Sequence, residues 1–454
     1  MNRRKKTCTE ALTRVYHFLL ERGCYMMSEI IPYTCVFIDA DWKVFVRAAM
    51  NCFSCHNRES LVRDLSSMWT NSQNPNHVIP CLSVRTGFDL FLRVKNFPPG
   101  SEILMSAVNI PDMITVVKHH GLKVVPLDIS IDTSGPKPEL LEGLITEKTV
   151  AVLVAHIYGK WINMGPVIRF AQKHGLSVIE DCAEVFCGFE KLGHPESDIA
   201  LFSFGVIKYY TAFGGAIAKI KDSEIFSQMK SLYDTYNVQK QSDYLYKIAK
   251  YFVPFIFLNC PSVIKPSMFL TRTFNIDHKA AFIKLLRGFP DHLMERIRHR
   301  PSTALLKVML GRFKSFSQSD FNTSQVKGEY VKERLPESVT LVGQEAEVNN
   351  YWLFPFLAEN PDNMVKLLNA MGVDAYRGAT QLNLIEPETS SQKGESESFD
   401  PFYPYEAKYL IDHVVYLPVN KTVPFEVLDK ICKCVELSVK MSKAAPVVHV
   451  RSKL

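Results

Sequence analysis

The sequence predicts an α/β fold in which helices cover a mostly parallel sheet. Two observations lead to this prediction. Short apolar runs recur after residue 80, at 102–105, 123–127, 149–155, 177–179, 199–204 and 216–220. Helical patterns lie between several of them, at 111–120, 138–145 and 164–174. Strands that alternate with helices are typical of parallel sheets. Ligands bind such sheets at the carboxyl ends of the strands, so chemistry is expected just after each apolar run.

The composition is that of an ordinary globular protein. Hydrophobic residues make up 47% of the 454 residues and charged residues 22%, which excludes a disordered or fibrous chain. At about 100–200 residues per domain, the length predicts two or three domains. The net charge of +6 is spread over the whole chain, so no nucleic-acid partner is expected.

The cysteines and the chain ends indicate the compartment. Eleven cysteines, an odd number in a long chain, favour a reducing environment over a disulfide framework. The start of the chain does not fit a secretory signal, and no run of about 18 apolar residues indicates a spanning helix. The last three residues, Ser452, Lys453 and Leu454, match a peroxisomal address. We therefore expect a peroxisomal import receptor as a partner and location in the peroxisomal matrix, with the cytoplasm as the alternative.

Residues 1–74 are expected to form a helical N-terminal extension. Within it, Cys52, Cys55 and His56 match the C-x-x-C-H pattern of haem attachment. Haem of that type is attached after export, for which no signal is visible, and zinc would need a second ligand pair close by. Buried structural cysteines are the favoured interpretation, and no metal is expected.

Three positions in the α/β region bear on chemistry. Thr86 and Gly87 open a helical pattern, where free amides can hold an anion. Asp181 follows the run 177–179, where an acid can pair with a cationic ligand atom. Lys208 follows the run 199–204 in aromatic surroundings, where desolvation lets a lysine form a Schiff base. Taken singly, each has an ordinary interpretation: a helix cap, a capping acid and a surface lysine.

Taken together, the three positions point to one cofactor. Pyridoxal 5'-phosphate (PLP) requires a phosphate cradle, a carboxylate for its pyridinium nitrogen and a Schiff-base lysine. The sequence supplies these groups in that order along one sheet, so we expect PLP to be bound.

From residue 84 to 221 the chain resembles the DegT/DnrJ/StrS sugar aminotransferases, as a divergent member. This family has the type I fold of PLP-dependent transferases, with a large domain and a smaller C-terminal α+β domain. The motifs that carry the resemblance are 100–104 (GSEIL), 125–129 (VPLDI), 155–159 (AHIYG), 178–183 (VIEDCA), 202–208 (FSFGVIK) and 214–216 (GGA). Two further segments fit more loosely, 350–355 (NYWLFP) and 372–378 (GVDAYRG).

The resemblance implies a role for each candidate residue. Lys208 would be the Schiff-base lysine and the base that moves a proton. Asp181 would hold the pyridinium proton. Thr86, the Gly87 amide and Ser203 would bind the cofactor phosphate.

Two positions depart from the family pattern. Ile110 stands near the place of an aromatic residue that stacks on the cofactor ring in many members, so contact there would be aliphatic. Glu184 stands where the family usually has Gln or His, and it brings a negative charge close to the cofactor.

The resemblance implies a homodimeric aminotransferase that moves an amino group from an amino acid to a keto-sugar or similar carbonyl compound, and the donor it implies is glutamate. Family dehydratases carry His in place of the lysine, so the retained Lys208 favours amino transfer. Two alternatives stay open. One is a non-catalytic scaffold that keeps the fold for dimerisation or binding, which the departures at Ile110 and Glu184 motivate. The other is a PLP enzyme of another reaction type, such as a lyase.

The domain prediction divides the rest of the chain. Residues 75–240 form the PLP-binding large domain, 241–320 a helical insertion, 321–440 the small domain and 441–454 a flexible tail. The insertion, rich in aromatic and basic residues, either packs on the core or forms an interfacial surface that contacts a membrane. Residues 386–401 are expected to form an exposed loop.

Overall fold

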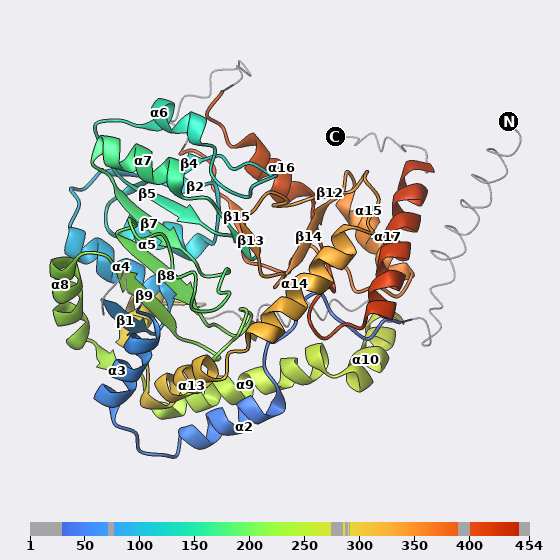
Figure 1. Ribbon diagram of the computed structural model, residues 1–454, viewed down its shortest axis with the longest axis horizontal. Helices are drawn as coiled ribbons and strands as arrows, with labels where there is room; N and C mark the ends of the chain where they lie inside the picture. The colour runs from blue at the N-terminus through green and yellow to red at the C-terminus, as the bar shows by residue number, and fades with distance from the viewer. Residues whose placement is uncertain are drawn as a thin grey trace, which may run out of the picture.

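A computed structural model describes residues 30–70, 77–273, 285–286, 289, 291–388 and 400–444. Its centre is a seven-stranded sheet in the order β1-β9-β8-β7-β5-β2-β4 (Figure 1). Only β9 runs antiparallel to its neighbours within this sheet. The strands are β1 Val78–Cys81, β2 Glu102–Ser106, β4 Lys123–Leu127, β5 Thr149–Ala155, β7 Ser177–Asp181, β8 Ile199–Ser203 and β9 Ala216–Ile220. Every apolar run singled out in the sequence is one of these strands, which confirms the mostly parallel α/β prediction.

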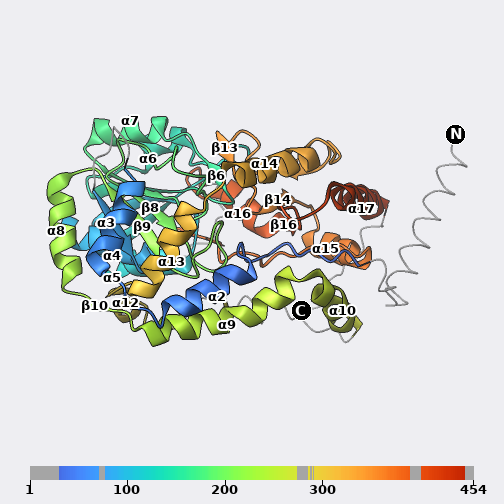
Figure 2. The same cartoon turned by 60° about the horizontal axis from the view of Figure 1, so that its bottom comes forward.

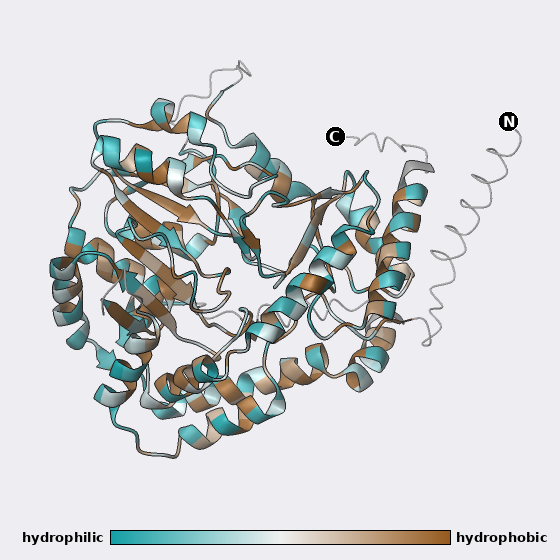
Figure 3. Ribbon diagram, in the orientation of Figure 1, coloured by the Kyte–Doolittle hydropathy of each residue, from teal (hydrophilic) through white to brown (hydrophobic). Residues whose placement is uncertain are grey.

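The two faces of the sheet enter different apolar cores, because successive side chains of a strand point to opposite faces. In β5, Ala151 and Leu153 pack with one group of helices, whereas Val152 and Val154 pack with another. The first group is α4 Val84–Lys95, α5 Pro111–His119 and α8 Ser223–Asp234. The second includes α6 Leu141–Leu144, which follows the short helix η2 Pro138–Leu140, and α7 Gly165–His174. Figure 3 shows the strands as the most hydrophobic part of this region.

The described part of the N-terminal segment is helical, as predicted, and belongs to the main core. Its helices are α2 Trp42–Asn51 and α3 Arg58–Met68. The buried residues Phe45, Leu65 and Trp69 join the same apolar cluster as β8. Cys52 is half-buried but Cys55 is exposed, so the prediction of a buried structural cysteine is wrong for Cys55. Cys55 lies in the turn between α2 and α3, where nothing in the described chain covers it.

Helices also dominate the segment after the sheet. They are α9 Gln241–Asn259, α10 Pro261–Thr273, α12 Leu293–Ile297, α13 Thr303–Lys314 and α14 Gln318–Lys332. Residues 293–310 are helical with an interruption before Pro301, where the short strand β11 His299–Arg300 separates α12 from α13. This strand pairs with β10 Asn237–Val238. Of residues 281–286 in the expected helical insertion, only 285 and 286 lie among the described residues, and both are helical.

A second sheet lies in the C-terminal part, with three antiparallel strands in the order β12-β14-β16. The strands are β12 Thr340–Leu341, β14 Phe354–Leu357 and β16 Val414–Leu417, and the helices are α15 Pro361–Ala370, α16 Tyr405–His413 and α17 Phe425–Ala444. Two short strand pairs connect this part to the large sheet: β3 Val108–Asn109 with β15 Asn383–Leu384, and β6 Lys160–Trp161 with β13 Val348–Asn349. The predicted tail 441–454, including its address, lies almost wholly outside the described residues. So do most of the expected loop 386–401 and residues 1–29.

A buried ionic cluster anchors α4, the helix that begins at the candidate site. The Asp89 carboxylate of α4 is fully buried and accepts two hydrogen bonds from Arg298, at 3.0 and 2.9 Å. His120 Nε2 lies 2.9 Å from the same carboxylate, and Tyr236 donates its hydroxyl at 3.3 Å. Burial alone would raise the pKa of Asp89, but the bonds from His120 and Arg298 lower it to about 2. Asp89 therefore ties α4 to the chain after α12.

This cluster predicts a loss of stability in acid. Because the pKa of Asp89 is lower in the folded state, its contribution is complete above about pH 4 and is lost as the pH falls towards 2. The contribution is about 2 kcal/mol. Asp89→Asn should lower the urea midpoint at pH 7 and flatten its decline between pH 4 and 2. An unchanged midpoint at pH 7 would contradict this role.

Candidate active site

A pocket opens at the carboxyl ends of β7 and β8, where the topology of the sheet predicts a ligand site. It encloses about 970 Å³ of space, part of it open to solvent. We call it the strand-end pocket. Its polar lining comes from four places in the chain: the start of α4, the end of β7, the end of β8 with the following loop, and the segment before β14. The lining includes Ser83, Arg85, Ile110, Asp181, Glu184, Ser203, Lys208, Gly214, Gly215 and Trp352.

Asp181 is the last residue of β7, and its carboxylate lies in the pocket wall. The residue is 6% exposed. One carboxylate oxygen accepts the amide of Ala183 at 3.1 Å, and no other described group donates to this carboxylate. Burial raises the pKa of Asp181, while the charge of Lys208 opposes that rise. A buried carboxylate with so few partners is suited to a cationic or N–H group of a ligand.

Lys208 lies in the same pocket, in the loop after β8. Its ammonium group forms an ion pair with Glu184 at 2.9 Å and lies 5.2 Å from the centre of the Trp352 ring. The second carboxylate oxygen of Glu184 accepts the amide of Tyr158 at 2.8 Å. Glu184 is thereby fixed, and it holds the lysine amine beside the pocket. Glu184, which departs from the family pattern, therefore contacts the Lys208 amine directly. The sequence alone could not show this contact.

The loop that carries Lys208 is clamped by residues far away in the chain. Asp39, before α2, accepts the amide of Tyr210 at 2.8 Å and forms an ion pair with Lys421 at 2.8 Å. Arg312 donates to the Asp39 carbonyl at 2.7 Å. Burial would raise the pKa of Asp39, but the nearby charges of Lys421 and Arg312 lower it instead. Sequence reasoning missed this clamp because an isolated aspartate, arginine or lysine carries no motif.

The glycine pair after the loop allows a close approach. Gly215 has a positive φ of 84°, and a Cβ atom there would lie 2.4 Å from the Met309 sulfur. A larger residue would displace α13 or the pocket wall. Ser203, at the end of β8, lines the same side and accepts the Gly205 amide at 3.5 Å.

At the start of α4 the structure differs from the expectation for Thr86 and Gly87. Neither lines the pocket. The Thr86 hydroxyl is buried and donates to the carbonyl of Ile297 at 2.7 Å, and both amides point back to the N-cap residue Ser83. Gly87 instead lets α4 pack on the sheet, since a Cβ would lie 2.8 Å from Leu201. The expected phosphate contact through the Thr86 hydroxyl and the Gly87 amide therefore has no free donor.

Ser83, Val84 and Arg85 face the pocket in their place. Among the described residues, nothing accepts a hydrogen bond from the amides of Val84 and Arg85, the first two of the helix. The Arg85 side chain forms an ion pair with Asp112 at 2.6 Å. A helix start with open amides and a guanidinium beside it suits an anion such as a phosphate. The residues that line the pocket, Ser83, Val84 and Arg85, come directly before Thr86 in the sequence.

Ile110 lies where the sequence indicated. It precedes α5, is half-buried and lines the pocket with its aliphatic side chain. Trp352 also lines the pocket and contributes an aromatic surface, which the looser 350–355 motif contained without an assigned role. A flat ring would meet apolar side chains from both.

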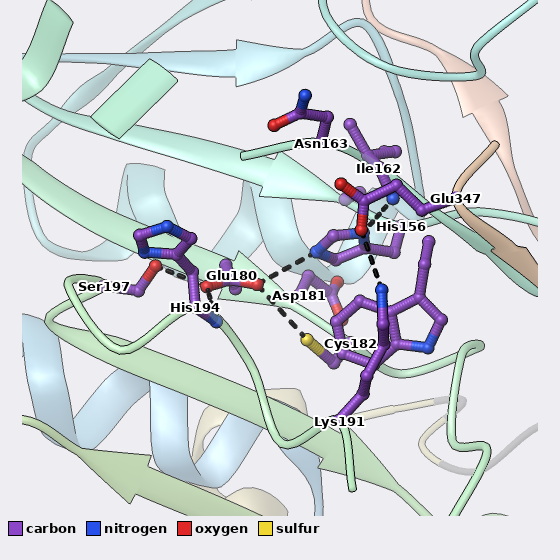
Figure 4. A network of polar contacts seen from close by, with 12 residues as sticks. His156, Ile162, Asn163, Glu180, Asp181, Cys182, Lys191, His194, Ser197 and Glu347 are labelled. Carbon is purple, nitrogen blue, oxygen red and sulfur yellow. Dashed lines mark hydrogen bonds and ion pairs between the residues drawn. The ribbon is translucent and has the colours of Figure 1, made fainter. Parts of the chain in front are cut away.

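Beside Asp181, a second group of buried polar side chains forms hydrogen bonds among its own members (Figure 4). His156 lies 3.1 Å from Glu180, and its other ring nitrogen accepts the amide of Ile162 at 3.1 Å. Glu180 also accepts the amide of His194 at 2.7 Å and the hydroxyl of Ser197. Cys182 lies close to Glu180, so three possible metal ligands meet here. Because these bonds already engage His156 and Glu180, the cluster supports the end of β7 structurally.

Comparison with known proteins agrees with this geometry. Residues 62–251 match the model of the DegT/DnrJ/EryC1/StrS aminotransferase family. The UDP-4-amino-4-deoxy-L-arabinose–oxoglutarate aminotransferase of Shewanella sediminis is 30% identical over 161 residues, 34% of this chain and 40% of that protein. The L-glutamine:2-deoxy-scyllo-inosose aminotransferase of Streptomyces fradiae is 34% identical over 162 residues, 34% of this chain and 37% of that protein. The chain thus spans about two fifths of these curated relatives.

Solved structures extend the likeness of the fold. The aminotransferase TlmJ from Streptoalloteichus hindustanus superposes with a TM-score of 0.61 at 13% identity, covering 89% of this chain and 98% of that one. NtdA from Bacillus subtilis, solved with bound PMP, superposes with a TM-score of 0.58 at 16% identity, covering 87% and 82%. The shared fold therefore reaches beyond residues 62–251 into the C-terminal part.

Proposed function

We propose that the protein is a PLP-dependent aminotransferase, because residues 62–251 match the model of the DegT/DnrJ/EryC1/StrS aminotransferase family. The observation that carries the proposal is that Lys208 and Asp181 line one pocket. The curated relatives act as aminotransferases, by their names, on sugar or cyclitol compounds. An amino acid, by family resemblance glutamate, is the proposed donor, and a keto-sugar or similar carbonyl compound is the proposed acceptor.

The pocket fits PLP in three respects. Asp181 is a buried carboxylate short of donors, which matches a protonated ring nitrogen. Lys208 supplies an amine in the pocket, and the start of α4 supplies open amides with Arg85 for the phosphate. When bound, PLP supplies an aldehyde that takes up amino groups and a ring that delocalises negative charge.

The residues of the chain then have separate tasks. Asp181 keeps the proton on the ring nitrogen, since only the protonated ring draws electrons strongly. Lys208 Nζ is the nucleophile, and once released it is the group that moves the proton at the reacting carbon. Glu184 holds the ammonium form of Lys208 in position. Ile110 and Trp352 add apolar surface to the pocket lining.

The acceptor is proposed to carry negative charge. A second cavity adjoins the strand-end pocket and shares Lys247, Tyr251 and Phe289 with it. It is rich in basic side chains: Lys240, Lys247, Lys250, Arg296 and His299, against Asp243. Some relatives are named for UDP- or GDP-linked sugars, whose phosphates such a surface would bind.

Spectra of the purified full chain test this function. After addition of PLP we expect a visible absorbance band that converts to the amine form on addition of L-glutamate. A nucleoside-diphosphate keto-sugar should restore the band faster than a neutral keto-sugar. No uptake of PLP would overturn the proposal. Uptake without conversion by any amino acid would instead favour a non-catalytic scaffold, and release of a cleaved product would indicate another PLP reaction.

Two finer expectations remain proposals. A homodimer rests on the family resemblance alone, and its mass can be measured by light scattering. The peroxisomal address rests on residues 452–454. A fluorescent fusion with and without them tests it, and diffuse signal from both would refute it.

A further inference from the structure

Helix α2 exposes an apolar face to solvent. Trp42, Val46, Met50 and Phe53 are 60%, 46%, 64% and 79% exposed. The spacing of Trp42, Val46 and Met50 puts them along one side of the helix, and Phe53 lies in the turn that follows it. The opposite side of the helix buries Phe45 and Ala48 in the core. Contiguous exposed aromatic and aliphatic side chains of this kind mark an interaction surface rather than scattered surface residues.

Helix α9 lies beside α2 and adds exposed apolar side chains. Figures 1 and 2 both show α2 and α9 side by side along one edge of the molecule. Phe252 of α9, 40% exposed, packs on Phe45 of α2 with ring centres 5.4 Å apart, so it links the two helices. Its neighbour Val253 is 50% exposed, and Leu270 of α10 is 52% exposed. We call these residues together the α2–α9 face.

Helix α9 and the first part of α10 are also long and apolar when taken together. No single helix in the described part of the chain is long and apolar enough to cross a bilayer. However, α9 and residues 261–270 meet that requirement as a pair bent by 81°. Since the helix pair is bent and partly packed on the core, it is suited to lie along a lipid surface rather than to span it.

Charge identifies the partner. Residues 42–58 and 244–273 contain no aspartate or glutamate, although acidic residues number 47 in the whole chain. The cations in these two segments include Lys43, Arg47, Lys250 and Lys265. Within these two segments every charged side chain is a cation, and the exposed acids Asp41 and Glu59 lie just outside the first of them. Apolar side chains interspersed with cations match anionic lipid headgroups over an acyl region. Two copies joined symmetrically through this face would bring these cations close to one another.

We propose that the α2–α9 face docks the protein on a membrane surface that contains anionic lipids. Trp42, Met50 and Phe53 enter the headgroup boundary, while Lys43 and Arg47 contact the headgroups. Because α9 also presents Lys247 and Tyr251 to the strand-end pocket, docking places that pocket beside the lipid surface. The proposal stands whether or not the protein transfers amino groups.

Trp42 offers a direct reporter of docking. The chain has four tryptophans, and the other three, Trp69, Trp161 and Trp352, are at most 4% exposed. We expect brominated phosphatidylcholine/phosphatidylserine vesicles to quench the fluorescence of the full-length protein. Trp42→Phe should still bind these vesicles but lose the quenching. Binding without quenching of Trp42 would show a different contact surface and overturn the proposal.

Sedimentation with vesicles measures the affinity. Trp42→Ser with Phe53→Ser should lower the partition coefficient at least about tenfold. Lys43→Gln with Arg47→Gln should lower it about 30-fold on anionic vesicles and little on neutral ones. The matched control, Val326→Ser with Leu437→Ser, removes exposed apolar side chains from α14 and α17 and should change nothing. Thermal melting of each variant verifies its fold.

Three results would overturn the proposal. The first is an absence of wild-type binding to anionic vesicles, and the second is equal binding to neutral ones. The third is a change of particle mass in Trp42→Ser with Phe53→Ser, with vesicle binding intact, because it would identify the face as a contact between copies.

Discussion

Lys208→Ala is expected to lower aminotransferase activity more than about a thousandfold, because it removes both the nucleophile and the proton-transferring base. The ammonium group of Lys208 lies in the strand-end pocket 2.9 Å from Glu184, and the described pocket lining offers only Lys247 as another lysine. Borohydride reduction of the protein with PLP, followed by peptide mass spectrometry, should locate the added mass on Lys208. The variant should show no such peptide and no visible absorbance band.

Lys160 provides a matched control for this experiment. It is 5% exposed and lines a different cavity, with its ammonium group 5.1 Å from the centre of the Tyr351 ring. Burial lowers its pKa to about 7, so it is the described lysine outside the site most prone to react with an aldehyde. Lys160→Ala should keep the cofactor and the activity. If reduction labels Lys160 rather than Lys208, the assignment of the site is wrong.

The large sheet was predictable because its strands are buried on both faces. Such strands are short continuous apolar runs, and runs such as 149–155 and 216–220 stand out between amphipathic helices. The positions of Asp181 and Lys208 followed, since each lies just after one of these runs. Their placement in one pocket is a consequence of parallel strands that end at the same edge.

The start of α4, where an anion is expected to bind, could be predicted only in part from the sequence. Thr86 and Gly87 were chosen for their residue types, but the helix begins two residues earlier, at Val84, with Ser83 as its cap. The cap engages the amides of both residues, and the Thr86 hydroxyl turns to Ile297. A boundary shift of two residues therefore moved the open amides to Val84 and Arg85.

Long-range contacts could not be predicted from the sequence, for a different reason. The Asp39 clamp joins residues 39, 210, 312 and 421, and the Asp89 cluster joins residues 89, 120, 236 and 298. Each partner is an ordinary polar residue in its own segment. Only the folded chain shows that these side chains meet, and the same holds for the α2–α9 face, whose halves lie about 200 residues apart in sequence.

The variant Asp181→Asn is expected to show whether Asp181 serves the reaction or the stability of the fold. Asparagine has nearly the same shape but cannot hold the charge that keeps a ring nitrogen protonated. Activity with L-glutamate should therefore fall about 10²- to 10³-fold, the usual cost of removing one preorganised electrostatic contact. Stopped-flow absorbance of the conversion to the amine form measures this directly. Asp181→Glu, which keeps the charge but displaces it, should retain more activity than Asp181→Asn if charge is the dominant contribution.

Asp181→Asn should lower the activity but not the stability of the cofactor-free protein. Burial raises the pKa of Asp181 in the folded protein. The folded state therefore holds this proton more tightly than the unfolded state does. As the pH rises above the ordinary carboxylate range, the proton is lost and the free energy of unfolding falls. Without PLP, Asp181→Asn should unfold at the same urea concentration as the wild type or a higher one at pH 7. Added PLP should stabilise the wild type more than the variant. A cofactor-free variant that unfolds earlier than the wild type would show that Asp181 serves the fold instead.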